Sequence, residues 1–513
     1  MTVVRGAEIR GRHVVEADVC VVGTGAGGAV AAAELAEGGL RVVMVEEGEH
    51  RPTAGFNARP RDMSMDLYRD AGQTVTLGNV PIVLPLGRGV GGTTMINSGT
   101  CFRTPAAVLA KWRDRFGLEA LDPQALGPAF DRVEHEIGVG QVTPELAGRN
   151  AAIVKRGADA LGWSVDYLHR NARGCVGSGV CCFGCPAAAK QHVGISYAPR
   201  AWEHGAVTYT GCEAQRVTHQ GWRASGVVAR CAGGGRLQVR APLVIVAGGA
   251  IGTPVLLERS GMAGRSGQLG RNLSLHPATA VKALMDEEVD MAVGVPQSLY
   301  IDEFAGEGIM FEGAAGPPDY MSAAFGVWGD ELRELMLSFQ KVSQFGVMVS
   351  DESRGIVRRR GGITSIRYDL VDADVARFQR GLELLTELYW RAGARRVFLP
   401  VAGSGVLETP GDLRGLRERR LRAKDLTLMA FHPLGTARAT ARREDGVVDG
   451  DLRHHDVDGL YVADGSVVPS ALGVNPQLTI MALATRLAFG LLGRPVPPTA
   501  EHVTAPTAAY APA

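Results

Sequence analysis

The feature that most constrains this chain is a glycine-rich turn between two short apolar runs near the N-terminus. Residues 19–22 are all apolar, residues 26–36 are rich in helix formers, and residues 40–45 are mainly apolar again. The turn carries Gly23, Gly25 and Gly28 with the spacing G-x-G-x-x-G. This order predicts a strand, a tight turn, a helix and a second strand, which together form a dinucleotide-binding unit.

Each part of this unit has a physical task. Gly23 permits the tight turn, Gly25 lets the backbone approach a pyrophosphate, and Gly28 lets the helix pack closely on the strand. Glu46 ends the second strand, where a carboxylate accepts hydrogen bonds from an adenosine ribose. An acid at this position favours FAD or NAD over NADP. The alternative is an ordinary glycine-rich turn, which leaves the second strand and its terminal acid unexplained.

The composition is that of a globular enzyme-sized chain. Its 513 residues suggest two to four domains, and 46% apolar residues are enough for large buried cores. Lys plus Arg equals Asp plus Glu at 54 each, so no global field attracts nucleic acid or an acidic membrane. We therefore expect a small-molecule partner and no nucleic acid.

Nothing in the sequence predicts export or insertion into a membrane. Charged residues run through the place where the apolar core of a signal peptide would lie. The longest uncharged run, residues 465–485, contains Pro469, Asn475 and Pro476, so we expect no transmembrane segment. Eight cysteines without an export signal favour reduced thiols, and we expect a cytoplasmic protein.

A second glycine-rich segment and further helices and strands are predicted along the chain. Residues 88–99 (RGVGGTTMINSG) combine glycines with small polar residues, as a phosphate-facing loop does, and a flexible surface loop is the alternative. The other predicted elements are a meander over 207–240, strands at 243–246, 345–358, 362–370 and 460–462, a glycine turn into a helix at 248–257, helical stretches at 105–140 and 150–162, and a last helix at 477–492. Apolar residues at helical spacing also predict a helix buried along Val375, Phe378, Leu382, Leu385 and Tyr389.

Two residues near the C-terminus are candidates for chemistry. His432 follows an apolar approach and precedes Pro433 and Gly435, so it lies on a turn. A buried structural histidine is the alternative role for it. Asn475 precedes Pro476, and this pair predicts the N-cap and first residue of the last helix. A helix N-terminus would also stabilise an anion placed before it.

Taken together, five segments resemble the glucose-methanol-choline (GMC) flavoprotein oxidoreductases, in family order and over nearly the whole chain. The segments are the fingerprint at 23–28 with Glu46, RGVGGTTMIN at 88–97, GAIGTPVLL at 249–257, HPLGT at 432–436 and YVADGSVVPSALGVNPQLTI at 461–480. Only residues 282–424 lack such a segment, and in this family that region holds the substrate domain.

The resemblance implies an α/β fold in which a Rossmann-type FAD-binding domain is interleaved with an α+β substrate domain built on an antiparallel sheet with helices. The implied division is 1–105, 200–281 and 425–495 for the FAD-binding domain, 106–199 for a substrate-side segment with a cysteine cluster, 282–424 for the substrate domain and 496–513 for a mobile tail.

The resemblance also implies FAD-dependent oxidation of the CH–OH group of an alcohol. His432 matches the catalytic histidine, which takes the hydroxyl proton while hydride moves to flavin N5, and Asn475 matches its partner, which binds the substrate oxygen. The implied FAD-binding residues are Gly23, Gly25, Gly28, Glu46, Arg88, Gly92, Thr93, Asn97, Val217, Asp464, Gly465 and Asn475.

Details of the resemblance bear on how the flavin is held and on which alcohols the site would take. Members with covalent flavin carry a histidine where this chain has Ile96, so we expect dissociable FAD. The asparagine at position 475 and the segments 271–277 and 184–191 look like those of sterol oxidases and bacterial long-chain alcohol oxidases. Both groups favour bulky apolar alcohols. Oxygen and another electron acceptor both remain open as the oxidant.

A cysteine cluster leaves two alternatives. Cys175, Cys181 and Cys185 have the spacing C-x5-C-x3-C-P, which resembles the ligands of an iron-sulfur cluster in some dehydrogenases of this family. The other alternative is a glycine-rich structural loop with reduced thiols. A zinc site lacks a clear fourth ligand.

Two other functions remain alternatives at this point. The first is a flavin-containing lyase on the same scaffold, because some family members use flavin structurally. The second is a nucleotide-binding subunit without catalysis, which the pairing of HPLGT at 432–436 with GVNP at 473–476 argues against.

Overall fold

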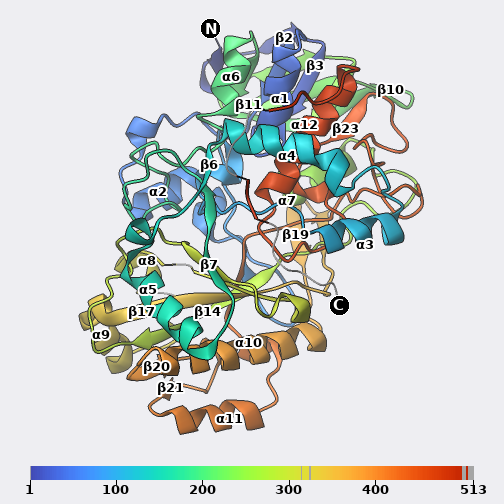
Figure 1. Ribbon diagram of the computed structural model, residues 1–513. Coiled ribbons are helices and arrows are strands. Elements are labelled where there is room, and N and C mark those ends of the chain that lie inside the picture. The colour runs from blue at the N-terminus through green and yellow to red at the C-terminus, as the bar shows by residue number, and fades with distance from the viewer. Residues whose placement is uncertain (1, 314, 323–324, 500–503, 507–513) are drawn as a thin grey trace.

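The computed structural model describes residues 2–313, 315–322, 325–499 and 504–506. Two large sheets organise the molecule (Figure 1). A parallel sheet lies in the half that holds both the N-terminal strands and the last helix, and an antiparallel sheet lies in the other half with α10 and α11. This arrangement confirms the predicted α/β fold with a second, sheet-based lobe.

The six-stranded sheet is parallel throughout, in the order β1-β9-β4-β3-β13-β23. Its strands are β1 (Val3–Arg5), β3 (Val19–Val22), β4 (Val42–Val45), β9 (Val207–Thr210), β13 (Leu243–Val246) and β23 (Leu460–Val462). The strands at 19–22, 243–246 and 460–462 lie where the sequence predicted them. Parallel sheets are covered on both faces, so their strands are short apolar runs, and β3 and β4 are buried at every residue.

Helices cover this sheet, and a buried charge cluster links three of them. They are α1 (Gly28–Glu37), α3 (Ala106–Phe116), α4 (Pro123–Glu136), α6 (Tyr197–Glu203), α7 (Gly249–Arg259) and α12 (Gln477–Leu491). Glu34 of α1 is buried, and it pairs with Arg132 of α4 at 2.8 Å and with Arg200 of α6 at 2.6 Å. A buried carboxylate needs such partners, so the cluster fixes how these helices pack around α1.

The predicted meander over 207–240 is partly wrong. β10 (Cys212–Gln220), β11 (Arg223–Cys231) and β12 (Arg236–Arg240) do form an antiparallel meander, to which β2 (Arg12–Glu16) adds in parallel. The first strand, β9, instead pairs with β1 and β4. Thr208 is fully buried and Tyr209 nearly so, which suits a strand inside a two-sided parallel sheet.

The second lobe is built on a sheet that is antiparallel except for one parallel pair, between residues 82–83 and 428–429. Its strands are β5 (Ile82–Val83), β7 (Val165–Tyr167), β14 (Pro277–Leu284), β15 (Leu299–Ile301), β16 (Ile309–Glu312), β17 (Val342–Val349), β20 (Arg396–Phe398), β21 (Val406–Leu407) and β22 (Leu428–Ala430). The associated helices are α2 (Pro60–Leu67), α5 (Pro144–Leu161), α8 (Pro318–Met321), α9 (Asp330–Leu337), α10 (Asp372–Arg391) and α11 (Leu413–Glu418). The five apolar residues predicted for one helix face are all buried on α10.

Two predicted boundaries in this lobe need correction. The strand expected over 345–358 is two elements, because β17 ends at Val349 and β18 (Ile356–Arg360) pairs only with β19 (Ile363–Arg367) in a separate hairpin. The loop between them is held by Asp374, whose carboxylate accepts from the backbone of Glu352 at 3.1 Å and of Ser353 at 2.9 Å. The sheet also extends beyond 282–424, since β14 starts at Pro277 and β22 ends at Ala430.

Two smaller strands, β6 (Val139–Gln141) and β8 (His169–Asn171), form a ribbon of their own. Residues 504–506, within the predicted mobile tail, pack on the protein: Ala505 is buried and the carbonyl of Pro506 accepts from the Arg103 N–H at 3.1 Å. The rest of that tail includes residues 500–503 and 507–513, which lie outside the described residues.

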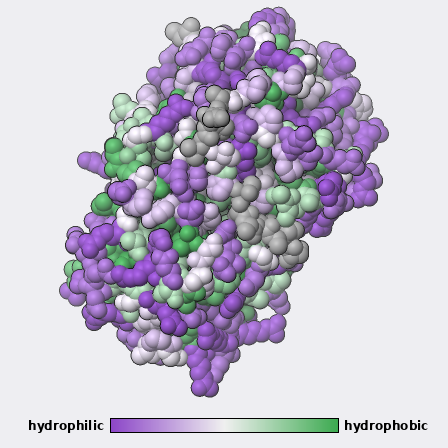
Figure 2. Space-filling view, viewed as in Figure 1, coloured by the Kyte–Doolittle hydropathy of each residue, from purple (hydrophilic) through white to green (hydrophobic). Residues whose placement is uncertain are grey.

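The face shown in Figure 2 is mostly hydrophilic, with smaller apolar areas between the polar ones. No helix within the described residues is both long enough and apolar enough to cross a bilayer.

Two glycines of the first turn give a test of the fold. A Cβ at position 28 would lie 2.1 Å from the carbonyl oxygen of Gly23, whereas a Cβ at position 25 would meet nothing closer than 4.0 Å. We expect Gly28→Ala to lower the free energy of unfolding by about 1–3 kcal/mol, as overpacked sites do. Gly25→Ala should change it by less than about 0.5 kcal/mol. Chemical denaturation of both variants measures this, and equal destabilisation would contradict the packing described here.

Candidate active site

Two glycine-rich segments meet at the start of α1. The Gly91 N–H donates to the carbonyl of Thr24 at 3.1 Å, and a Cβ on Gly92 would lie 2.9 Å from the Cα of Gly25. The open space at Gly25 therefore lies beside the 88–99 segment. Both segments were expected to face phosphate, and the fold places them against each other.

Glu46 is fixed at the end of β4. Its Oε2 accepts from the backbone N–H of Thr24 at 3.0 Å and from the Thr24 hydroxyl at 2.7 Å, and its Oε1 accepts from the Gly48 N–H at 2.9 Å. A carboxylate offers about four acceptor positions, so three internal donors leave one free. That remaining position suits a ribose hydroxyl.

The Asp464 carboxylate links the C-terminal segment to the turn before α7. It accepts from the Gly249 N–H at 2.9 Å, the Ser466 N–H at 2.7 Å and the Thr253 hydroxyl at 2.5 Å. Burial raises the pKa of Asp464 above its usual value. Asp464 and the adjoining Gly465 thus belong to a rigid corner between β13 and β23.

The other predicted FAD-binding residues have their own partners. Thr93 Oγ1 accepts from the Gly87 N–H at 3.2 Å, and Asn97 donates to Gln477 Oε1 at 2.9 Å. The Val217 N–H donates to Ser260 Oγ at 2.9 Å. The half-exposed Arg88 side chain lies 3.8 Å from the Glu47 carboxylate.

His432 and Asn475, predicted as a pair from segments 43 residues apart, do come together. Asn475 Nδ2 lies 3.3 Å from His432 Nε2. His432 follows β22, and Asn475 precedes α12. The predicted capping role of Asn475 is wrong, because Pro476 is the N-cap and Asn475 makes no capping bond. Its amide points at His432 instead.

The sequence did not predict Glu312, the last residue of β16. Its carboxylate is buried, and Oε1 accepts from Asn475 Nδ2 at 3.3 Å. Burial raises the pKa of Glu312 to about 7. The only local signal is an acid at the end of the apolar run IMFE, and nothing near it in sequence shows that it faces Asn475.

His276 is a second member that sequence reasoning did not place in the site. It is fully buried, and its Nδ1 lies 3.3 Å from Nδ1 of His432 with the two rings nearly perpendicular at 78°. Burial lowers the pKa of His432 well below its usual value, and the neighbouring His276 lowers it further. His432 is therefore a neutral imidazole at neutral pH.

Two buried polar atoms of the side chains around His432 have no hydrogen-bond partner within the described residues. They are Oδ1 of Asn475 and Oε2 of Glu312. A buried acceptor without a hydrogen bond costs free energy, so unpaired groups at one place indicate a binding position. A hydroxyl group fits both atoms, and the glycines at 25 and 92 leave backbone accessible for a dinucleotide.

The cysteine loop lies beside the 88–99 segment. Lys190 Nζ donates to the carbonyls of Met95 at 2.8 Å, Asn97 at 2.6 Å and Cys181 at 2.7 Å, and Arg170 donates to Cys181 Sγ at 3.1 Å. No group of three or more His, Cys, Asp or Glu side chains in the described part of the chain is arranged to hold a metal ion. Cys175, Cys181 and Cys185 nevertheless line one pocket together with Arg170 and Lys190.

Comparison with known proteins relates the chain to a family. GMC oxidoreductase profiles match residues 64–278 and 352–484, and an FAD-binding domain profile matches residues 16–88. A GMC-type oxidoreductase of Mycobacterium tuberculosis is 42% identical over 93% of this chain and 76% of its own. Long-chain-alcohol oxidase FAO4B of Arabidopsis thaliana is 27% identical over 92% of this chain and 66% of its own.

The solved structures agree in fold. Pyridoxine 4-oxidase from Mesorbium loti superposes with a TM-score of 0.70 at 19% identity, covering 92% of this chain and 98% of its own. Formate oxidase superposes with the same TM-score at 16% identity, covering 92% and 97%. Extensive identity to a GMC-type relative, together with the matched FAD-binding region, establishes that this chain belongs to the FAD-dependent GMC oxidoreductase family.

Proposed function

We propose that this protein oxidises the CH–OH group of an alcohol to a carbonyl. The observation that carries the proposal is the position of the buried Asn475 amide, 3.3 Å from both His432 Nε2 and Glu312 Oε1. These groups can bind a hydroxyl and remove its proton. The similarity to Arabidopsis long-chain-alcohol oxidases supports the same chemistry.

Bound FAD supplies the two-electron acceptor for this reaction. An alcohol gives up hydride from carbon readily only when its hydroxyl proton leaves, so the site needs a proton acceptor at the oxygen. Two side chains qualify: His432, which is neutral, and Glu312, whose pKa near 7 makes it a carboxylate just above neutral pH. The Asn475 amide orients the oxygen between them.

The proposed substrate is a bulky, apolar alcohol. Met310, which shares the face of β16 with Glu312, is buried and apolar, and Phe431 next to His432 is an exposed aromatic residue. Such surroundings favour desolvation of an apolar substrate over recognition of a sugar. Oxygen or another carrier would regenerate the cofactor, and Ile96 in place of a histidine supports dissociable FAD.

Anaerobic reduction tests this function. Long-chain alcohols or sterols, added without oxygen, should bleach the yellow absorbance of the FAD-bound protein. We expect His432→Ala to keep FAD but slow this bleaching by about 10²–10⁴-fold, the usual effect of losing a group that removes the proton or stabilises charge at the substrate oxygen. The exposed His219 on β10 serves as the matched control, because His219→Ala should leave the rate unchanged. A flavin that stays oxidised with every alcohol, while the substrate is cleaved, would identify a lyase instead.

The pH dependence tests Glu312 separately. Because burial raises its pKa to about 7, Glu312 is protonated below this pH and becomes a proton acceptor above it. The rate of anaerobic flavin reduction should therefore rise with pH through about 7 in the wild type. Glu312→Gln cannot ionise, so its slower rate should show no such rise. A rise that persists in the variant would exclude Glu312 as its cause.

A further inference from the structure

We propose that His276 is a positioning residue that determines which ring nitrogen of His432 carries the proton. The proposal concerns the resting protein, and its consequence for catalysis rests on the alcohol oxidation proposed above. It follows from a series of hydrogen-bond contacts. The series begins at the backbone before α12, passes through His276 and His432, and ends where the substrate oxygen would bind.

The first step fixes the tautomer of His276. Two backbone N–H groups point at its Nε2, from Leu472 at 2.8 Å and from Gly473 at 3.2 Å. A backbone N–H can only donate, so Nε2 of His276 must hold a lone pair. The proton of the neutral ring is therefore on Nδ1.

The second step transfers this constraint to His432. Nδ1–H of His276 faces Nδ1 of His432 at 3.3 Å, so Nδ1 of His432 must accept. Burial lowers the pKa of His276 to about 3 and that of His432 well below its usual value, so both rings are neutral at neutral pH. A neutral His432 that accepts at Nδ1 carries its proton on Nε2, the nitrogen that faces Asn475.

The third step concerns Asn475. An Nε2–H donor opposite Asn475 Nδ2 would place two donors 3.3 Å apart. Asn475 Nδ2 keeps Glu312 Oε1 as its acceptor at 3.3 Å, so it stays a donor and cannot accept from Nε2–H. Asn475 therefore offers the Nε2–H of His432 no acceptor, and the oxygen of a bound alcohol supplies one.

The catalytic consequence is a division of roles. His432 Nε2–H donates to the substrate oxygen and stabilises the negative charge that develops there. The hydroxyl proton passes to the Glu312 carboxylate, the carbon loses hydride to the two-electron acceptor, and the C–O bond becomes a carbonyl. The structure thus assigns proton acceptance to Glu312 and hydrogen-bond donation to His432, which reverses the role expected of His432 from sequence.

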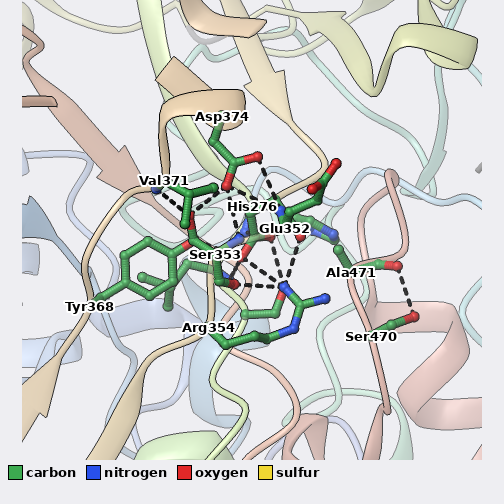
Figure 3. Close-up of polar contacts among 12 residues, drawn as sticks. His276, Glu352, Ser353, Arg354, Tyr368, Val371, Asp374, Ser470 and Ala471 are labelled. Atoms are coloured by element: carbon green, nitrogen blue, oxygen red, sulfur yellow. Dashed lines mark hydrogen bonds and ion pairs between the residues drawn. The ribbon is translucent and has the colours of Figure 1, made fainter. Parts of the chain in front are cut away.

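The position of His276 is rigidly maintained. Its φ of +48° is in the left-handed region, which a histidine adopts only when its surroundings impose it. Asp351 imposes it by accepting from the N–H groups of Leu275 at 3.1 Å and His276 at 3.0 Å, and from the Tyr368 hydroxyl at 2.7 Å. Figure 3 shows His276 beside Tyr368 and Arg354 in this network.

The charged groups near the histidine pair come from two elements. Asp351 and Arg354 lie on the loop after β17, and Glu312 ends β16. Arg354 contributes to the lowered pKa of His276. In the hydrogen bonds described, no charged side chain accepts from Nδ1–H of His276. The acceptor of this hydrogen bond is therefore Nδ1 of His432.

Nuclear magnetic resonance of the FAD-bound protein with isotope-labelled histidine nitrogens tests the assignment. We expect the His432 signals, identified by their loss in His432→Ala, to show a proton on Nε2 and none on Nδ1. A wild-type His432 with its proton on Nδ1 would overturn the proposal. This measurement needs no substrate, so it stands whether or not the proposed alcohol oxidation is correct.

Two substitutions of His276, by side chains that have the same shape as each other, provide a matched comparison. Asparagine and aspartate both tolerate a positive φ, but only asparagine can donate to His432 Nδ1. We expect His276→Asn to keep Nδ1 of His432 unprotonated and His276→Asp to place a proton there. The same state of Nδ1 in two folded variants would contradict the proposal. If the aspartate variant does not fold, the wild-type signals decide alone.

Anaerobic flavin reduction links the tautomer to function. We expect His276→Asn to keep the pH profile of the wild type, and His276→Asp to lower the limiting rate by about tenfold or more with little change in the alcohol concentration for half-maximal rate. Equal rates and pH profiles in both variants would show that the tautomer does not matter for catalysis. Absence of reduction in the wild type would instead refute the proposed function.

Discussion

The contact between two loops from different sheets makes this site possible. The Leu434 N–H donates to the Ser274 carbonyl at 2.9 Å, and the Ser274 N–H returns a bond to Leu434 at 3.1 Å. Ser274 precedes β14 of the antiparallel sheet, while the Gly435 N–H donates at 3.1 Å to Gly465 beside β23 of the parallel sheet. The turn that carries His432 is therefore tied to both lobes, and without this tie His276, His432 and Asn475 would not meet.

Electrostatics in the site follow from burial rather than from ion pairs. His276, Glu312 and Asn475 are nearly inaccessible, and the described contacts give Glu312 no cationic partner. Desolvation disfavours the charged forms, which keeps the histidines neutral and brings the carboxyl close to equal populations of acid and base at neutral pH. A proton-accepting group acts best when its pKa lies near the working pH, as that of Glu312 does.

Sequence predicted the parts of the fold that depend on neighbours along the chain. Strands β3, β13 and β23 matched their predicted ranges, because a two-sided parallel sheet requires short apolar runs with turns at their ends. β9 was misassigned because its alternating pattern is also that of a meander, and only its tertiary partners decide between the two. The predicted cap at Asn475 failed because Pro476 occupies the N-cap position and the amide finds a buried partner instead.

Glu312 and His276 were not predicted as site residues because their roles depend on tertiary contacts. Nothing within several residues of Glu312 or His276 marks them as partners of His432, since their roles come from strands and loops that meet only in the folded chain. The most direct test of the account is a crystal structure of the FAD-bound protein with the carbonyl product of a long-chain alcohol. We predict the carbonyl oxygen within about 3 Å of both His432 Nε2 and the Glu312 carboxyl group. An oxygen bound away from these two side chains would contradict it.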